Sequence, residues 1–151
     1  MLNQLFHNNS AVIAKAATYF GSQALVLSVD FKFMNGDFYV FTHHGKINTN
    51  KSLSSVLQSA EAIGIGEILL NSIERDGSAL GLDLVATRKA MASCSLPIIT
   101  CGGAGVQMHF SECFAATDVN AIAAGNIFHF SENSYPRAKE YLKRKGIPIR
   151  S

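Results

Sequence analysis

Short apolar runs alternate with segments of helical periodicity along the whole chain. The apolar runs are typical of strands that are buried on both faces, and they cover residues 24–29, 67–70, 97–100 and 121–124. A helical segment follows each run, and one further helix, with Ser10 as its expected N-cap and Gly21 at its end, precedes the first run. Because parallel strands require crossover connections, this alternation predicts an α/β fold of four parallel strand–helix units.

A β-hairpin is predicted after the first strand. Asn35-Gly36 stands between two runs of alternating aromatic residues, and an Asn-Gly pair favours the tight turn of a two-residue hairpin. Each predicted helix has one apolar face. The inward residues are Val12, Ile13, Ala16 and Phe20 in the first helix, Leu53, Val56, Leu57, Ala60 and Ile63 in the second, and Val106, Phe110, Cys113 and Phe114 in the helix after the third strand.

The number of strands leaves the architecture open. An eight-stranded (βα)8 barrel needs about 200 residues or more. A chain of 151 residues with four parallel strands is therefore half of such a barrel or a small open sheet. No linker, repeat or low-complexity segment divides the sequence, so we expect a single domain over residues 1–151.

The composition excludes several classes of protein. With 48% hydrophobic and 16% charged residues, the chain can bury a core and is not intrinsically disordered. A net charge of +2, scattered along the sequence, is too weak to predict nucleic-acid binding. Membrane insertion and secretion are not expected. No apolar stretch approaches the roughly 18 residues of a membrane helix, and the first ten residues lack the features of a secretory signal.

The cysteines indicate a reducing environment. Cys94, Cys101 and Cys113 are odd in number and lack the paired spacing of metal ligands. We therefore expect free thiols, a cytoplasmic location, and no metal or other cofactor. His43-His44 has no third ligand at metal-like spacing, so we expect both side chains in an exposed loop.

Asp30 is the first candidate for chemistry. It ends the first predicted strand, where an ionised carboxylate is costly unless it is paired or partly solvated. It could simply start the hairpin or pair with Lys32. A carboxylate at the carboxyl end of a parallel strand can also act as a general acid or base, because ligands of parallel α/β folds bind at that edge.

The run Cys101-Gly102-Gly103-Ala104-Gly105 predicts a phosphate site. Glycines between a strand and a helix let backbone N–H groups approach an anion. Asp76-Gly77 and Gly125-Asn126 follow the neighbouring strands and could add donors to the same cup, although each pair taken alone is an ordinary turn. A thiol nucleophile at Cys101 is the less favoured interpretation, because no motif links a histidine to it.

These motifs together resemble the cyclase subunit family of imidazole glycerol phosphate synthase. The resemblance spans the whole chain in order, and it rests on Phe20-Gly21-Ser22-Gln23, the strand ending in Asp30 with Lys32, Val40-Phe41-Thr42 with Gly45, Gly66 to Leu70, Asn71 to Gly77, Cys101 to Gly105, and Ile127 to Phe130. It implies the second half of a (βα)8 TIM barrel, with four parallel units that match strands 5–8 of the family and a hairpin insert. The chain would then begin near the end of the fourth family strand.

The resemblance also implies a lyase activity in histidine biosynthesis. In this family a glutaminase partner releases ammonia, which passes through the barrel to a substrate that bears two phosphates, a ribulosyl aminoimidazole carboxamide. Two aspartates, at the ends of the first and fifth strands, serve as acid and base. By this resemblance Asp30 is the fifth-strand aspartate, and Glu67 lies near the ammonia entrance. The phosphate and substrate site comprises Asn71, Asp76, Gly77, Gly102, Gly103, Gly125 and Asn126.

Several positions depart from the usual family pattern. Asn71 replaces threonine, Glu74 replaces aspartate, Ser78 replaces threonine, and Gly125-Asn126 replaces an Ala-Ser type pair. These substitutions resemble a paralogous branch that uses ammonia to amidate or amidinate sugars of surface polysaccharides. A non-catalytic phosphate-binding half-barrel is the remaining alternative.

A half-barrel of this kind is expected to need a partner. The family barrel has two similar halves, each with an aspartate and a phosphate loop. Two copies of this chain related by a two-fold axis could close an eight-stranded ring and remove two exposed sheet edges. We therefore expect a homodimer, or association with an N-terminal half-barrel.

Overall fold

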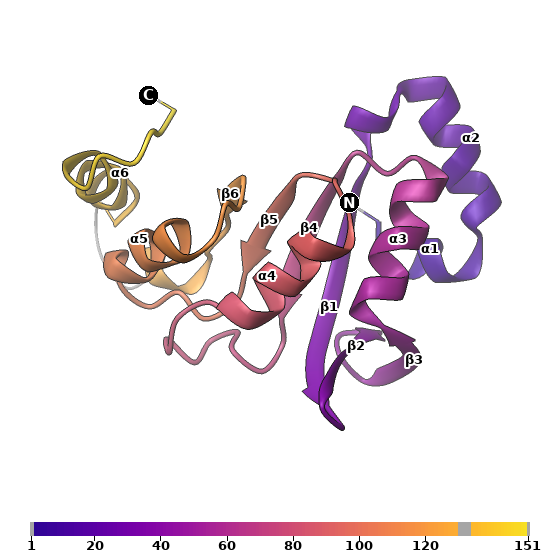
Figure 1. Cartoon of the computed structure of the whole chain (residues 1–151), viewed down its shortest axis with the longest axis horizontal. Coiled ribbons are helices and arrows are strands. Elements are labelled where there is room, and N and C mark those ends of the chain that lie inside the picture. Colours follow the sequence, from indigo (N-terminus) through magenta and orange to yellow (C-terminus); the bar gives the residue numbers. More distant parts are fainter. Residues whose placement is uncertain (1, 130–133, 151) are drawn as a thin grey trace.

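A computed structural model describes residues 2–129 and 134–150, so Phe130, quoted above for the resemblance, lies outside the described residues. Figure 1 shows the arrangement of the elements. The helices are α1 (Gln4–Asn8), α2 (Ser10–Phe20), α3 (Leu53–Ile63), α4 (Leu84–Ser93), α5 (Gln107–Ala116) and α6 (Ser134–Arg144), with 3-10 turns η1 (Ser22–Ala24) and η2 (Asn126–Phe128). The strands are β1 (Val26–Met34), β2 (Asp37–Thr42), β3 (Ile47–Ser52), β4 (Glu67–Ser72), β5 (Ile98–Cys101) and β6 (Ala121–Ile122).

The predicted α/β architecture is confirmed. One six-stranded sheet has the order β3-β2-β1-β4-β5-β6. The four strands β1, β4, β5 and β6 pair in parallel, and the crossover helices α3, α4 and α5 connect or follow them. Leu2 forms an additional parallel bridge to Leu27, so the segment before α1 lies along the first half of β1. Two helices rather than the single predicted one therefore precede β1.

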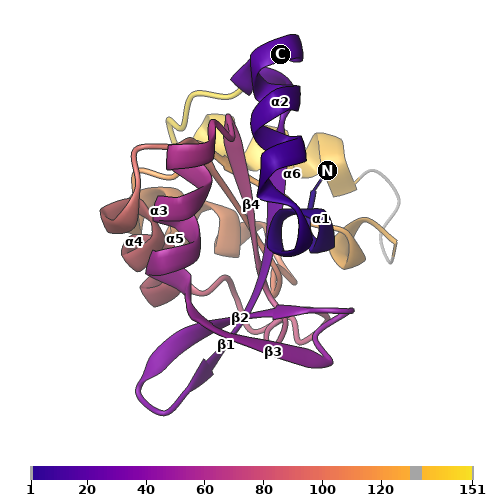
Figure 2. The same cartoon turned by 90° about the vertical axis from the view of Figure 1, so that its right-hand side faces the viewer.

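The two faces of the parallel strands differ in burial. Leu27, Val29 and Phe31 of β1 and Ile68 and Leu70 of β4 are at most 2% exposed, and they pack with α3 and α4 in the main core. The alternate residues are only half-buried, and we call their side of the sheet the open face: Val26, Ser28, Asp30, Glu67, Leu69, Asn71, Ile99 and Cys101. Figure 2 shows α3, α4 and α5 gathered on one side of the strands.

The hairpin is confirmed and is larger than predicted. Asn35 and Gly36 have φ of 51° and 84°, as a tight turn with two left-handed residues requires. β1 continues without a break from the parallel region into the hairpin, because Asp30 pairs with Phe41 on one side and Asn71 on the other. Asp30 therefore lies within a strand rather than at its end. A third strand, β3, extends the hairpin, and the sequence did not predict it.

Local residues cap the helices, and one predicted cap is corrected. Ser52 and Asp83 cap α3 and α4 with their side chains, and Gly64 ends α3 in the left-handed conformation. The cap of α2 is Asn9, whose Oδ1 accepts from the Val12 N–H, rather than Ser10. Asn9 is the N-cap because Ser10 is already the first residue of the helix, one position earlier than predicted.

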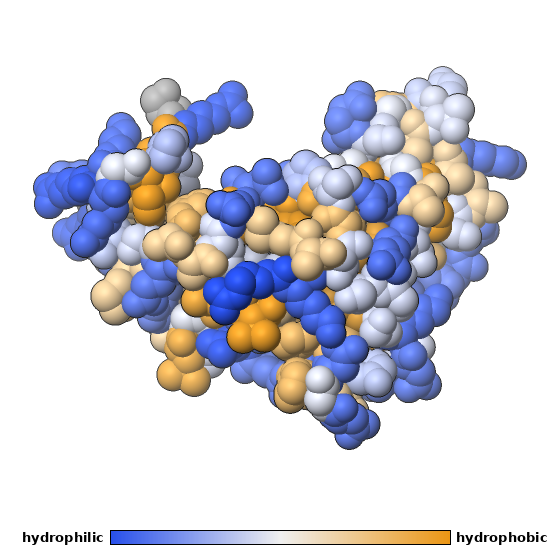
Figure 3. All heavy atoms as spheres, viewed as in Figure 1, coloured by the Kyte–Doolittle hydropathy of each residue, from blue (hydrophilic) through white to orange (hydrophobic). Residues whose placement is uncertain are grey.

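The predicted apolar faces are only partly buried. In α2, Ile13 is buried, whereas Val12 is 46% and Phe20 64% exposed, which contradicts the predicted face. Val106 is also 46% exposed, because it precedes the first turn of α5 and lies outside the helix. Figure 3 shows a hollowed outline between the part of the molecule that carries α2 and the part that carries α6. Among the described residues, no helix has the length and apolar character needed to cross a membrane.

Candidate functional site

Asp30 lies on the open face and is held by two carboxamides. Asn3 Nδ2 donates to Asp30 Oδ2 at 3.1 Å, and Asn71 Nδ2 donates to Asp30 Oδ1 at 3.0 Å. Asp30 does not form the alternative ion pair with Lys32. The Lys32 ammonium donates to the Gly45 carbonyl at 3.3 Å and lies 4.9 Å from the centre of the Phe41 ring. The carboxylate is thus oriented by neutral donors.

A row of three polar side chains crosses the parallel strands at the level of Asp30. Asp30 of β1 is in register with Asn71 of β4, and Asn71 is in register with Cys101 of β5. Each of the three belongs to the half-buried set on its strand, so their side chains share the open face. Parallel pairing therefore brings together residues that are 30 to 71 positions apart in the sequence.

The predicted glycine residues line one pocket. Its lining includes the whole predicted cup, and we use the name glycine cup for Asp76, Gly77, Gly102, Gly103, Gly125 and Asn126. The pocket is small, about 20 Å³, and Cys101, Ala79, Ala104 and Ala124 complete its wall. Gly77, Gly102 and Gly103 have φ of 75°, 92° and 102°, a conformation that favours glycine. Asn71, by contrast, lies beside the cup rather than in its wall.

The glycine cup is built by one loop packing on another. The Gly81 N–H donates to the Gly103 carbonyl at 2.8 Å, and Arg75 Nη1 donates to the Gly81 carbonyl at 3.2 Å. A Cβ added to Gly103 would come within 2.3 Å of the Gly81 carbonyl oxygen. A side chain at Gly103 would therefore displace the neighbouring loop. Ala79 is left-handed at φ 59°, which is strained for a residue with a Cβ.

The cup is suited to an anion through its backbone rather than through charge. Of its lining residues, Asp76 carries the only carboxylate, and none is Lys, Arg or His. η2 starts at Asn126, and the first N–H groups of such a turn have no partner within it. A phosphate here would be bound by main-chain donors.

Cys101 is placed between the two parts of the site. Burial raises the pKa of the Cys101 thiol, and the nearby Asp76 and Asp30 carboxylates raise it further, while the Gly102 N–H opposes the shift. The thiol is therefore protonated at neutral pH, which argues against its use as a nucleophile. All three cysteines are free of disulfide bonds.

Glu67 lies on the same open face at the other end of β4. It is four residues before Asn71 and in register with Val26, which begins β1. At about 3.3 Å per residue, Glu67 and Asn71 are separated by about 13 Å along the strand. Leu69 is the open-face residue between them.

Glu74 ties the hairpin to the loop that carries the cup. Its Oε2 accepts from the Phe33 N–H at 2.9 Å, just beyond the point where the Ile73 N–H donates to the Phe31 carbonyl. The side chain thus continues the pairing of β1 after β4 has ended. Glu74 departs from the usual family pattern, and its contact with Phe33 was not predicted from the sequence.

The histidines are not gathered into a metal site. His43 and His44 are exposed, as predicted, and both are left-handed at φ 54° and 58° in the β2–β3 turn. His109 Nδ1 accepts from the Gly105 N–H at 3.1 Å and so supports the glycine turn. Among the residues that the structure describes, no three His, Cys, Asp or Glu side chains are close enough to hold a metal ion.

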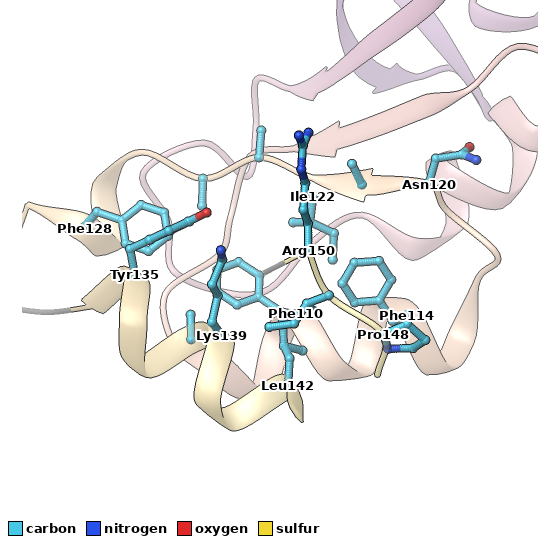
Figure 4. A pocket seen from close by; sticks show the side chains of 15 residues that line it. Phe110, Phe114, Asn120, Ile122, Phe128, Tyr135, Lys139, Leu142, Pro148 and Arg150 are labelled. Atoms are coloured by element: carbon cyan, nitrogen blue, oxygen red, sulfur yellow. The ribbon is translucent and has the colours of Figure 1, made fainter. Parts of the chain in front are cut away.

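A second pocket is larger than the glycine cup. It has a volume of about 490 Å³ and lies between β6, α5 and α6 (Figure 4). Phe110, Phe114, Ile122, Phe128 and Leu142 give it an apolar wall, and Lys139 and Arg150 add two positive charges. We call it the β6 groove. Ala124 lines both this groove and the glycine cup, but none of the predicted site residues lines the groove.

Asn3 is the site residue that the sequence did not predict. It lies in the short segment that pairs with β1 before α1, and its carboxamide reaches Asp30 from the side opposite Asn71. This segment before α1 is only three residues long, which is too short for a strand-like alternation to be recognised. The only signal was the resemblance, which put the start of the chain near the end of a family strand.

Comparisons with known proteins agree on one family. A family model described as "Histidine biosynthesis protein" matches residues 1–134. The chain is 41% identical to "Imidazole glycerol phosphate synthase subunit HisF" of Saccharolobus solfataricus, over 99% of this chain and 59% of that protein. It is 42% identical to the protein of that name from a Thermotoga species, over 99% and 58%, and 40% identical to the one from Chlorobaculum parvum, over 95% and 57%. The chain thus spans somewhat more than half the length of these relatives.

Proposed function

Since this chain belongs to the histidine biosynthesis protein family, we propose that it acts as the C-terminal half of the cyclase subunit of imidazole glycerol phosphate synthase. Its substrate would be the bisphosphorylated ribulosyl aminoimidazole carboxamide, and its second substrate ammonia derived from glutamine. The products would be imidazole glycerol phosphate and an aminoimidazole carboxamide ribotide. Asp30 would serve as general acid or base, and the glycine cup would bind one phosphate.

One observation carries this proposal: Asp30 and the glycine cup occupy the same edge of the sheet. Asn71 bonds Asp30, and its Oδ1 lies 3.2 Å from where a Cβ of Gly102 would be, so a single side chain spans from the carboxylate to the cup. A substrate whose phosphate occupies the cup would extend its carbon chain toward Asp30. A phosphate bound in the cup would hold the reacting carbon chain in place beside Asp30, and such positioning accelerates a reaction.

The position of Glu67 supports a glutaminase as partner. Glu67 is on the open face at the amino end of β4, opposite the end that carries Asn71. Ammonia that entered near Glu67 would reach Asp30 by passing along the open face beside Leu69. We therefore propose that the glutaminase subunit docks at the amino ends of the strands.

The burial pattern supports completion of a barrel by a second half. The open face is half-buried, and β6 ends the sheet with a free edge above the β6 groove. At the other end of the molecule, α2 exposes Tyr19 at 82% and Phe20 at 64%. Two copies arranged head to tail would bring the α2 end of one against the β6 end of the other. We propose that residues 1–151 form one (βα)4 unit that is completed in this way or by an N-terminal half-barrel.

Two other functions fit particular residues. Asn71, Glu74, Ser78 and Gly125-Asn126 depart from the pattern of the histidine enzymes and favour a paralog that transfers ammonia to sugars of surface polysaccharides. The small volume of the glycine cup and its dependence on backbone donors would also suit a non-catalytic phosphate-binding unit. The cyclase and the paralog differ in their substrates, and the binding unit would convert neither substrate.

A single assay separates them. The chain is incubated with ammonium and, in turn, the bisphosphorylated ribulosyl substrate or a nucleotide-linked sugar, and the products are followed by mass spectrometry. Formation of imidazole glycerol phosphate is expected. Aminated sugar would favour the paralog, and stabilisation by phosphate ligands without any turnover would favour the binding unit.

A further inference from the structure

A third pocket, of about 320 Å³, lies on the helix side of the sheet. Val85 and Arg88 of α4, His109 and Glu112 of α5, and the loop between β4 and α4 line it, and we call it the outer pocket. The strands that these helices follow, β4 and β5, are interior strands of the sheet. A second half-barrel that joined at the sheet edges would therefore leave the outer pocket open. Its volume falls within the range of about 300–1,000 Å³ that small-ligand sites occupy.

The apolar part of the outer pocket is exposed to solvent. Leu80 is 77% and Val85 62% exposed, and both line the pocket. Leu82, on the same loop as Leu80, also lines it and is buried. Large apolar side chains that stand in water beside a cavity gain free energy when a ligand covers them. The pocket is therefore suited to an apolar group.

Two hydrogen-bond donors lie on the polar side of the pocket. His109 Nδ1 accepts from the Gly105 N–H at 3.1 Å, so the neutral ring carries its proton on Nε2 and can donate there. Arg88 Nη1 donates to the Ala116 carbonyl at 3.2 Å. A guanidinium has five N–H groups, so others remain to donate to a ligand. Arg88 and His109 can thus bind one carboxylate group.

The other charged groups at the pocket have different roles. Arg75 Nη1 donates to the Gly81 carbonyl at 3.2 Å, and Arg75 Nε lies 3.7 Å from Asp83 Oδ2, so this guanidinium is held by its own loop and its charge is offset. Among the described residues that line the pocket, Glu112 has the one carboxylate. It can only accept, so it would bind an N–H group of the ligand.

We propose that the outer pocket binds an α-carboxylate whose α-carbon also carries an apolar side chain and an N–H group. Arg88 and His109 would donate to the carboxylate, as charge-assisted bonds favour. Glu112 would accept from the N–H group, and Leu80 and Val85 would cover the apolar side chain. Two sources share this chemistry: the C-terminus of a polypeptide that ends in an apolar residue, and a free apolar amino acid. The inference does not rest on the proposed function, because none of the residues that line the outer pocket belongs to the glycine cup.

The test uses N-acetyl-leucine, which carries all three groups. Two-dimensional ¹H–¹⁵N spectra of the chain are recorded during its titration at constant pH and ionic strength, and saturable shifts are expected at the backbone amides of Gly81, Val85 and His109. N-acetyl-leucinamide lacks the carboxylate and acetate lacks the side chain, so each should bind at least about tenfold more weakly. An equal response to either compound, or no saturable response to N-acetyl-leucine, would overturn the proposal.

Two variants locate the binding. The side chains of Arg88 and Val85 are exposed, so Arg88→Gln and Val85→Ser should leave the fold intact. The half-saturating concentration of N-acetyl-leucine should rise by about tenfold in Arg88→Gln and about threefold in Val85→Ser. Arg137→Gln, at an exposed position on α6, is the matched control and should bind as wild type does. Wild-type binding by both pocket variants, or an equal loss in the control, would overturn the site.

Free leucine distinguishes the two sources. Its ammonium would donate to Glu112 with a full charge, so binding at least as tight as that of N-acetyl-leucine would assign the pocket to a free amino acid. Glu112→Gln should then weaken leucine more than N-acetyl-leucine. Binding of N-acetyl-leucine without binding of leucine would assign the pocket to the end of a polypeptide.

Discussion

Asn71 and Asp30 are register partners in the parallel pair β4–β1, and Asn71 Nδ2 donates to Asp30 Oδ1 across that pair at 3.0 Å. The oxygen of that amide, Asn71 Oδ1, lies against Gly102, so Asn71 links the acid–base candidate to the glycine cup. Register thus fixes the distance between the two parts of the proposed site, because neither partner can shift along its strand without moving the whole sheet.

Two glycines of the cup should respond differently to substitution. No atom lies within 4 Å of a Cβ at Gly125, and its φ of −114° suits any residue. Gly125→Leu should therefore change stability by no more than about 0.5 kcal/mol. Its side chain would enter the pocket that Gly125 lines, so the affinity for glycerol phosphate should fall by about tenfold or more. Calorimetric titration measures this affinity, and unchanged binding would contradict the phosphate assignment.

Gly103→Ala should instead destabilise the fold. The new Cβ would overlap the Gly81 carbonyl oxygen, and φ is 102°. A loss of about 2 kcal/mol or more in the free energy of unfolding is expected, measured by urea denaturation. A side chain at Gly103 is thus directed at the backbone of Gly81.

The reactivity of Cys101 should depend on pH in a predictable direction. Because burial and the Asp76 and Asp30 carboxylates raise the pKa of the thiol, its thiolate fraction at pH 8 is below that of an ordinary cysteine. Alkylation by iodoacetamide, followed by peptide mass spectrometry, should be slower at Cys101 than in a model peptide and should accelerate as the pH rises beyond 9. Glycerol phosphate should slow it further. Reaction at the model rate at pH 8 would contradict the placement of this thiol.

Asp37 should make a small, pH-dependent contribution to stability. The hydrogen bond from the Lys89 ammonium, the hydrogen bond from the Phe38 N–H and the positive charge of Lys89 lower the pKa of Asp37 below its ordinary value of 3.8, and partial desolvation opposes the shift. A lowered pKa means that the contribution is complete above pH 3.8 and is lost as the pH falls through the lower value of the folded state. Both side chains are about one-third exposed, so Asp37→Asn should cost only about 0.5 kcal/mol at pH 7.

Thermal unfolding of wild type and Asp37→Asn between pH 7 and pH 2 measures this difference. It should shrink toward zero at the acid end. A difference that grew on acidification would show that Lys89 is not the partner that stabilises the carboxylate.

The order of elements and the glycine cup could be read from the sequence because both depend on local pattern. Asn35-Gly36 in the hairpin and Gly21 at the end of α2 act within a few positions. The cup gathers because every contributing turn follows a parallel strand. Asn3 could not be predicted, since its place depends on pairing with a distant strand. β3 pairs with the neighbouring β2, but its sequence, INTNKS, is mostly polar and lacks the apolar pattern of a strand. The exposure of Phe20 was missed for a related reason: periodicity shows that a face is apolar but not whether another element covers it.

The mass of the chain in solution tests the completion of the barrel. Two copies would bury the open face and both sheet edges, so light scattering after gel filtration should give about twice 16.3 kDa at micromolar concentration. Tyr19→Ser on the exposed face of α2 should shift the equilibrium toward the monomer. A well-folded wild-type monomer would contradict completion by a second copy.

Turnover by Asp30→Asn tests the central claim most directly. General acid–base catalysis is worth about 10²- to 10⁴-fold, so the variant should lose at least that much ammonium-dependent conversion of the bisphosphorylated ribulosyl substrate. It should retain phosphate binding, because Asp30 is not part of the cup. Asp118→Asn, at an exposed position, is the matched control and should keep the wild-type rate. Loss of product in Asp30→Asn alone is the result that this account predicts, and an Asp30→Asn rate close to that of wild type would contradict it.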